Sequence, residues 1–144
     1  MRCWKILQDD GTVMHGGTGR WSLPTAEHPG AWMPPITNLM LCASGYHLCR
    51  DSDVLQWLGP VIYEAEHRGR VLEDEEKIVV ESARLVRRIE TWTPQTARLF
   101  ACVCAERAFT SVSMPDPRSV HAVRIARQYA EGTATCEELA VAWD

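Results

Sequence analysis

The fold is decided by residues 41–70, which read LCASGYHLCRDSDVLQWLGPVIYEAEHRGR and predict a strand, a short helix and a second strand. The first strand covers residues 46–49, where alternation puts His47 and Cys49 on one face. A short helix over residues 52–58 follows, with an aspartate at its start and a Gly-Pro pair at its end. This unit therefore places the densest group of reactive side chains in the chain on neighbouring elements.

The second strand of this unit, VIYEAE, alternates strictly. Val61, Tyr63 and Ala65 share one face, and Glu64 and Glu66 share the other. Two carboxylates on one face of a strand belong either to a solvated outer surface or to a catalytic acidic pair. Both interpretations stay open from the sequence alone.

The N-terminal part of the chain predicts two more strands and a long loop between them. The run CWKIL at residues 3–7 is rich in β-formers and ends at an Asp-Asp-Gly turn, and residues 39–42 predict a further short strand. A glycine-rich segment at residues 15–19 could let its backbone approach a phosphate, although no P-loop pattern follows it. The loop also holds four prolines, with Trp21 and Trp32, which either fill the core or supply an aromatic wall for a flat ligand.

The C-terminal part predicts helices. Residues 78–89 predict one long bent strand or two shorter ones, and after Trp92 the apolar period changes from two residues to about 3.6. A Thr-Pro pair, an Asp-Pro pair and a capping box then start three helices in turn. Because strands come first and helices last, we expect an α+β domain. A mixed, twisted sheet with a short helix over residues 1–92 would pack against two or three helices over residues 93–144.

Composition is typical of a globular protein. The chain has 144 residues, of which 46% are hydrophobic and 24% charged, and this is enough for one domain with a real core. The net charge is −4, and the basic residues are scattered, which argues against a nucleic-acid groove. The chain has no apolar run of about 18 residues, and its N-terminus does not resemble a signal peptide. We therefore expect a cytoplasmic protein without membrane contact.

Cys42, His47 and Cys49 are candidate metal ligands, since zinc prefers sulfur and nitrogen donors. Their spacing, C-x4-H-x-C, is not that of a standard zinc finger, and a fourth donor would have to come from Cys3 or His67. The alternative is that the thiols are buried and act as small apolar side chains. We expect this alternative, and no bound zinc.

The segments GYHLC and IYEAE, joined by a helix that ends near Trp57, resemble the central part of the ADP-ribosyltransferase superfamily. The rifampin-modifying members are the most similar, and the RNA 2′-phosphotransferases have a similar H-x-H-L strand. The resemblance implies that NAD is the cofactor and that His47 stacks on the nicotinamide ring. It also implies that Glu66, or Glu64, orients the ribose and stabilises the positive charge that develops as the glycosidic bond breaks. It places in the cofactor pocket, besides His47, the residues Tyr46, Trp57 and Lys5.

The pattern C-x-x-G-Y-H-x-C at residues 42–49, the E-x-x-G at residues 66–69 and the acidic turn before Ile78 resemble a family of uncharacterised phage and prophage proteins. This second resemblance covers most of residues 1–92 and implies a viral or mobile-element origin. We therefore expect either an NAD-binding, ADP-ribosyltransferase-like protein that modifies a host macromolecule, or a non-catalytic phage protein that binds and inhibits a host factor.

Overall fold

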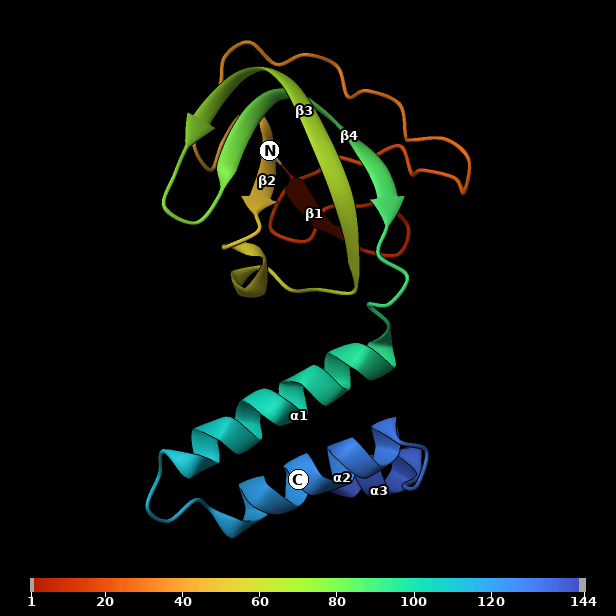
Figure 1. Cartoon of the computed structure of the whole chain (residues 1–144), viewed down its shortest axis with the longest axis vertical. Helices are drawn as coiled ribbons and strands as arrows, with labels where there is room; N and C mark the ends of the chain where they lie inside the picture. The colour runs from red at the N-terminus through yellow and green to blue at the C-terminus, as the bar shows by residue number, and fades with distance from the viewer. Residues whose placement is uncertain (1, 143–144) are drawn as a thin grey trace. The chain divides into compact units, whose positions relative to one another are not determined.

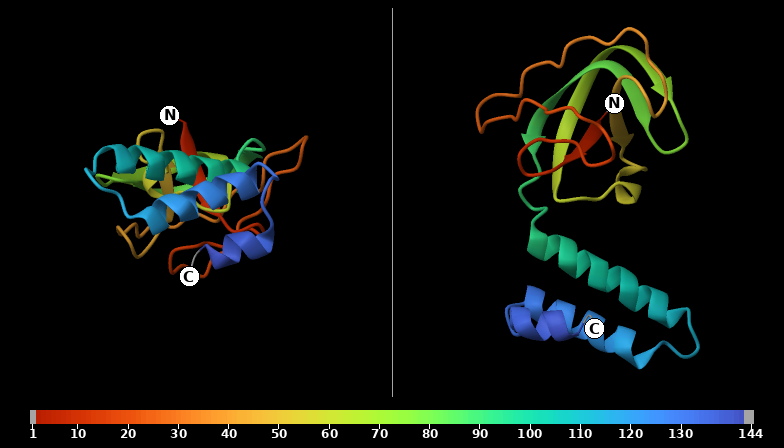
Figure 2. Two further views of the ribbon diagram at one scale, coloured as in Figure 1. Left: turned by 90° about the horizontal axis from the view of Figure 1, so that it is seen from below. Right: turned by 180° about the vertical axis from the view of Figure 1, so that it is seen from behind.

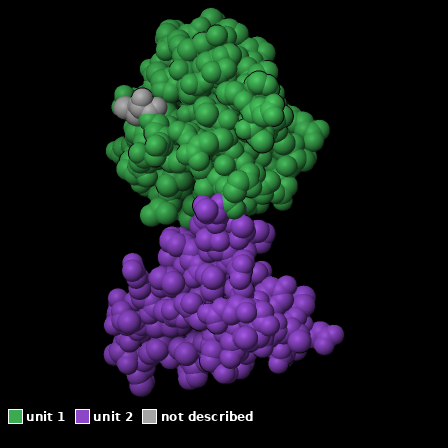
Figure 3. All heavy atoms as spheres, turned by 45° about the vertical axis from the view of Figure 1, so that its right-hand side comes forward, with its two compact units in different colours: residues 1–90 green, residues 91–144 purple. Residues whose placement is uncertain are grey.

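The computed structural model describes residues 2–142, and the chain divides into two compact units. Unit 1 is Met1–Glu90 and unit 2 is Thr91–Asp144 (Figure 3). Within the described residues, the strands lie in unit 1 and the α-helices in unit 2. The expected α+β class is therefore confirmed, while the packing of the helices on the sheet stays a prediction.

Unit 1 contains a closed barrel with the strand order β1–β2–β4–β3 (Figure 1). Each strand pairs with two neighbours, and all of these pairs are antiparallel. The expectation of a mixed sheet is therefore wrong, because closure of the barrel places β1 between two strands that are both antiparallel to it. The strands are β1 (Cys3–Leu7), β2 (Tyr46–Arg50), β3 (Val61–Glu73) and β4 (Ile78–Arg88).

β3 and β4 are long and strongly bent, which allows so few strands to close (Figures 1 and 2). Their register shifts between Glu64 and Ala65 and again between Arg68 and Val71. Gly69 lies at the second shift with a φ of 81°. Irregularities of this kind bend a strand and increase its twist. The region after the acidic turn is therefore one bent strand, which is one of the two expected forms.

The proline-rich stretch between Trp21 and Ile36 covers the part of β4 that β2 does not reach. β2 pairs with residues 78–80 of β4. Proline cannot donate to a ladder, so the stretch forms no regular strand. Three of its amides, three residues apart, nevertheless hydrogen-bond to every second carbonyl group of this part of β4. Gly30, Met33 and Ile36 donate to the carbonyl oxygens of Leu85, Ala83 and Glu81, each at 2.8 Å.

A turn replaces the strand that was expected at residues 39–42. Met40 and Ser44 form an isolated antiparallel bridge, in which the amide of Ser44 donates to the carbonyl oxygen of Met40 at 2.9 Å. Cys42, at the tip, has a φ of 61°, in the left-handed region that non-glycine residues rarely adopt. The local apolar pattern therefore predicted a strand where the chain reverses.

The helix expected over residues 52–58 is reduced to one 3-10 turn, Val54–Gln56. Asp51 does not cap it, because its carboxylate accepts a hydrogen bond from the indole nitrogen of Trp4 on β1 at 2.6 Å. A contact distant in sequence has therefore overridden the local capping signal.

The inward face of β3 is the one expected from its alternation. Val61, Tyr63 and Ala65 are at most 3% exposed and belong to the barrel core. Trp21 is 5% exposed and packs into the same core from the loop. Trp32 is only partly buried, so the interpretation of both tryptophans as core residues holds for Trp21 alone.

Unit 2 contains α1 (Pro94–Thr110), α2 (Pro117–Ala130) and α3 (Cys136–Val141), each starting after its expected capping residue. The capping box of Thr135 and Glu138 is present. Cys102 is the buried residue of α1, while Val103 and Cys104 are exposed. No helix within residues 2–142 has both the length and the apolar character that a membrane span requires.

Candidate functional site

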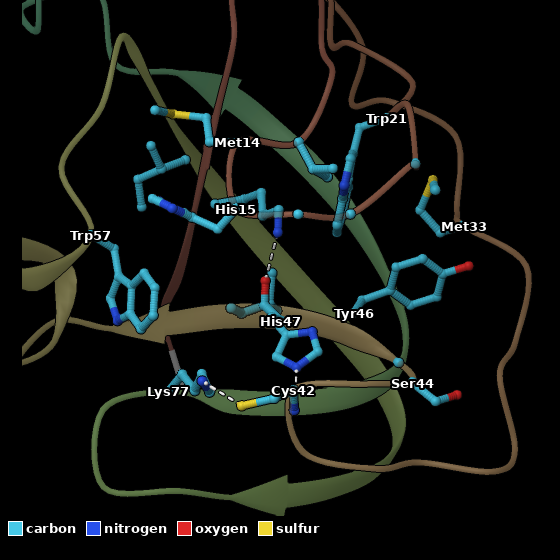
Figure 4. A pocket seen from close by; sticks show the side chains of 18 of the residues that line it. Met14, His15, Trp21, Met33, Cys42, Ser44, Tyr46, His47, Trp57 and Lys77 are labelled. Atoms are coloured by element: carbon cyan, nitrogen blue, oxygen red, sulfur yellow. Dashed lines mark hydrogen bonds between the residues drawn. The ribbon is translucent and has the colours of Figure 1, made fainter.

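A cavity of about 530 Å³ opens in unit 1 next to the short pairing of β1 with β2 (Figure 4). The register of these two strands covers two residue pairs, both at the N-terminal end of β1. Beyond them, Lys5 on β1 donates from Nζ to the backbone carbonyl oxygen of His47 on β2 at 3.0 Å. A side chain therefore bridges the two strands where a backbone ladder would otherwise continue, and it does so at the cavity wall.

All four residues expected in a cofactor pocket line this cavity, namely Lys5, Tyr46, His47 and Trp57. The glycine-rich loop at residues 15–19 also lines it. The sequence did not point to Lys77, which lies in the turn immediately before β4. One signal was available: the chain has only two lysines among its 15 basic residues, and both line the cavity. Further lining residues are Met14, Trp21, Met33 and Cys42.

Each lysine lies over the face of a tryptophan. The Nζ of Lys5 is 5.2 Å from the ring centroid of Trp21, and the Nζ of Lys77 is 5.1 Å from that of Trp57. Figure 4 shows the two indole rings at different sides of the cavity, Trp57 at the left of the view and Trp21 at the upper right. The cavity therefore offers a cation together with an aromatic ring twice, once on each side.

Both indole rings are held by further contacts. Trp57 donates from its indole nitrogen to the carbonyl oxygen of Glu76 at 3.1 Å and meets the His15 ring edge-to-face at 5.4 Å. Trp21 meets Tyr46 edge-to-face at 5.5 Å. The rings are therefore fixed before any ligand arrives, which limits the conformational entropy lost on binding.

The cavity is positively charged although the chain as a whole is negative. Among the described residues, those that line it include two lysines and two histidines but no aspartate or glutamate. Burial lowers the pKa of Lys5 from 10.5 to about 8. Lys77 donates from Nζ to the Sγ of Cys42 at 3.1 Å, and this hydrogen bond raises the pKa of Lys77. Both amines are therefore mainly ammonium at neutral pH, and Lys77 remains so well into the alkaline range.

His47 closes the turn that follows Met40. Its Nε2 accepts a hydrogen bond from the backbone amide of Cys42 at 3.1 Å, and the ring also hydrogen-bonds to the backbone of Gly45. Burial, followed by the charges of Lys5 and Lys77, lowers the pKa of His47. The imidazole is therefore held neutral and in one orientation, which suits a structural role better than proton transfer.

The two carboxylates expected to be catalytic are not among the residues that line the cavity. Glu64 accepts a hydrogen bond from the Nε of Arg87 at 2.7 Å, and Glu66 is paired with Arg84. Each pair joins cross-strand partners on β3 and β4. Opposite charges in that position stabilise a sheet. The structure therefore supports the interpretation of this face as a solvated outer surface and separates Glu64 and Glu66 from His47.

The three candidate metal ligands are not arranged as a ligand set. Within residues 2–142, no group of three or more His, Cys, Asp and Glu side chains could hold a metal ion. Cys49 is buried, as expected, whereas Cys42 is exposed, so its expected burial is wrong. The Nε2 of His47 is already used by the Cys42 amide.

Comparison of the chain with models of known protein families, with curated proteins and with solved structures finds no match. The resemblances to ADP-ribosyltransferases and to phage proteins therefore stay predictions.

We expect His47→Ala to lower the free energy of unfolding by about 1–2 kcal/mol, because the Cys42 amide loses its acceptor. The folded pKa of His47 lies below the unfolded value of 6.5, so its stabilising contribution is present above pH 6.5 and is lost as the pH falls through the folded pKa. The difference from wild type should therefore shrink in acid. Urea unfolding at about pH 5 and about pH 8 measures this.

The matched control is His28→Ala, since the His28 side chain is exposed in the loop. An equal loss of stability in both variants, or a difference that grows in acid, would show that His47 does not close the turn as a neutral ring.

Proposed function

We propose that unit 1 binds a small ligand that combines an anionic group with a flat ring, and that NAD or its ADP-ribose part is this ligand. The observation that carries the proposal is the pair of Lys–Trp contacts at one cavity whose described lining residues include no carboxylate. A protein with net charge −4 that gathers both of its lysines there favours an anion at that point.

The ammonium groups retain hydrogen-bonding capacity for a ligand. An ammonium group has three donors. Lys5 gives one of them to the His47 carbonyl oxygen, at 3.0 Å. Lys77 contacts the Cys42 thiol and lies 3.9 Å from a carboxylate oxygen of Asp74, a distance too long for a strong ion pair. Phosphate oxygens that reach the cavity would therefore find donors on both sides.

The rest of the wall suits a ring and a phosphate backbone. The volume of about 530 Å³ falls within the range typical of cofactor sites. Trp21 and Trp57 supply aromatic faces, and Met14 and Met33 supply adaptable apolar surface. Gly16 and Gly19 have no atom within 4 Å of the position a Cβ would occupy, so the backbone of the glycine-rich loop is open to a ligand.

The proposal is one of binding and does not include ADP-ribosyl transfer through Glu64 or Glu66. Such a transfer requires a negative group close to the developing oxocarbenium charge. Both carboxylates are instead neutralised by arginines on the outer face of β3 and β4.

Calorimetric titration of the full chain tests the proposal. We expect NAD and ADP-ribose to bind with a Kd below about 1 mM, and nicotinamide and adenosine, which lack the phosphates, to bind at least about tenfold more weakly. Lys77→Met should weaken ADP-ribose binding by about tenfold or more, because it removes the cation that stays charged.

Arg20→Met is the matched control, since it removes one positive charge from an exposed side chain that is not among the lining residues. The absence of heat at millimolar ADP-ribose, or equal affinity in the two variants, would rule out this ligand class.

A further inference from the structure

The cavity uses lysine, and not arginine, at both of its strongly basic positions, which a simple anion site does not require. Thirteen of the 15 basic residues are arginine, and the two lysines both line the cavity. Arginine binds phosphate at least as well as lysine but is always charged, whereas a lysine can lose its proton and act as a nucleophile. The choice of lysine at these two positions therefore favours chemistry of the amine itself.

We propose that Lys5 is a nucleophilic amine that forms an imine with an aldehyde or ketone group of a ligand held by Lys77. Lys5 lies on β1 between Cys3 and Leu7, which are fully buried in the barrel core. Its Nζ is positioned by the His47 carbonyl oxygen and by the face of Trp21, and it reaches the cavity wall. A buried lysine without a neighbouring carboxylate is the usual setting of an imine-forming amine.

The surroundings of the two amines shift their pKa values in opposite directions. No described carboxylate forms a salt bridge with Lys5, and burial lowers its pKa to about 8, so a useful fraction is neutral in mildly alkaline solution. The pKa of Lys77 is raised by the Cys42 contact and then by the nearby carboxylates of Asp74 and Glu76. Lys77 therefore stays charged and anchors an anion, while Lys5 reacts. The other titratable groups of the lining are His15, Cys42, Tyr46, His47 and Cys49.

The reaction needs no oxidant or reductant. The lone pair of neutral Nζ attacks the carbonyl carbon, a C–N bond forms, and the carbonyl π electrons move to oxygen, which takes up a proton. The carbinolamine then loses its hydroxyl group and the remaining nitrogen proton, which leave together as one water molecule, and a C=N bond results. The inference goes beyond ligand binding and does not require that the ligand be NAD.

The test uses the small number of amines in the chain. Full-length protein is incubated with pyridoxal phosphate, a carbonyl compound with a flat ring and a phosphate, and the imine is reduced with cyanoborohydride. Peptide mass spectrometry then compares the modification of Lys5, Lys77 and the N-terminal amine. We expect Lys5 to be modified at least about tenfold faster than Lys77, with a rate that rises as the pH passes 8. Pyridoxal, which lacks the phosphate, should react more slowly at Lys5.

Lys5→Arg separates this inference from the binding proposal. The variant keeps a positive charge but cannot form an imine, so it should lose trapping while ADP-ribose binding falls by less than in Lys77→Met. Equal modification of Lys5 and Lys77, or faster modification of Lys77, would overturn the inference even if ADP-ribose binds. Trapping at Lys5 that is equally fast with pyridoxal would overturn the anchoring role of Lys77.

Discussion

Lys5→Met is expected to make the protein more stable near neutral pH while it weakens ligand binding in the cavity. The folded protein holds a largely buried ammonium group whose pKa is lowered from 10.5 to about 8. A pKa shift of that size means that burial of the charged amine lowers the free energy of unfolding by about 3 kcal/mol at neutral pH. Loss of the hydrogen bond to the His47 carbonyl offsets about 1 kcal/mol of the gain. The net expectation is about 1–2 kcal/mol of added stability, with ADP-ribose binding weakened at least about tenfold.

The stability difference between Lys5→Met and wild type is expected to depend on pH. Between pH 8 and pH 10.5 the unfolded chain binds the Lys5 proton more tightly than the folded protein does, so wild-type stability rises with pH across this window. The advantage of the variant should therefore vanish and then reverse as the pH approaches 10.5. Urea unfolding of the full chain, followed by tryptophan fluorescence, measures both trends.

Lys77→Met is the matched control, because it removes the same charge from the same cavity. The Cys42 contact raises the pKa of Lys77, so its ammonium form is favoured by folding and its loss should not stabilise the protein. If both variants were destabilised alike at neutral pH, the burial of Lys5 would carry no penalty and its assignment as the reactive amine would lose support.

Gly30→Ala is expected to destabilise unit 1 by about 3 kcal/mol or more. A Cβ at this position would lie 2.0 Å from the backbone carbonyl oxygen of Ser22. The clash is with backbone, so no side-chain rotation relieves it. Gly30 cannot move away freely either, because its amide donates to the Leu85 carbonyl oxygen on β4 at 2.8 Å. The substitution should therefore detach the proline-rich stretch from β4.

Gly19→Ala is the control for this experiment, since no atom lies within 4 Å of the Cβ it would introduce. We expect its effect to stay within about 0.5 kcal/mol. Thermal melts of the two variants beside wild type give the comparison, and a Gly30→Ala protein that melts with wild type would show that the stretch does not pack against β4 as described.

Local signals in the sequence predicted the elements well. The strand at residues 3–7, the strand that begins at Tyr46 and the inward face of β3 follow from alternation, which acts over two residues. The helix starts follow from Thr-Pro, Asp-Pro and capping-box patterns, whose hydrogen bonds join residues two or three apart. The prediction failed where a residue distant in sequence competes for the same group. Asp51 was expected to cap the short helix, but its carboxylate accepts a hydrogen bond from the Trp4 indole.

The candidate site could be predicted only in part. Four expected cofactor residues do line one cavity, because the strand–turn–strand unit that carries three of them is local. The acidic pair does not line the cavity. Alternation shows that Glu64 and Glu66 share a face but not that Arg87 and Arg84 lie opposite them on β4. Action on a host macromolecule stays a prediction.

By itself, the sequence determined the α+β class, the order of the elements and the faces of the strands, because these depend on residues within one or two turns of chain. Only the tertiary structure decided that the sheet closes into a barrel, that the proline-rich stretch covers β4 and that Lys5 faces Trp21 inside the cavity. In the run CWKIL, Lys5 reads like any strand lysine with its charge in water. Lys5 is buried by segments far away in sequence, and this burial lowers its pKa. No local pattern in the sequence could therefore predict the shift.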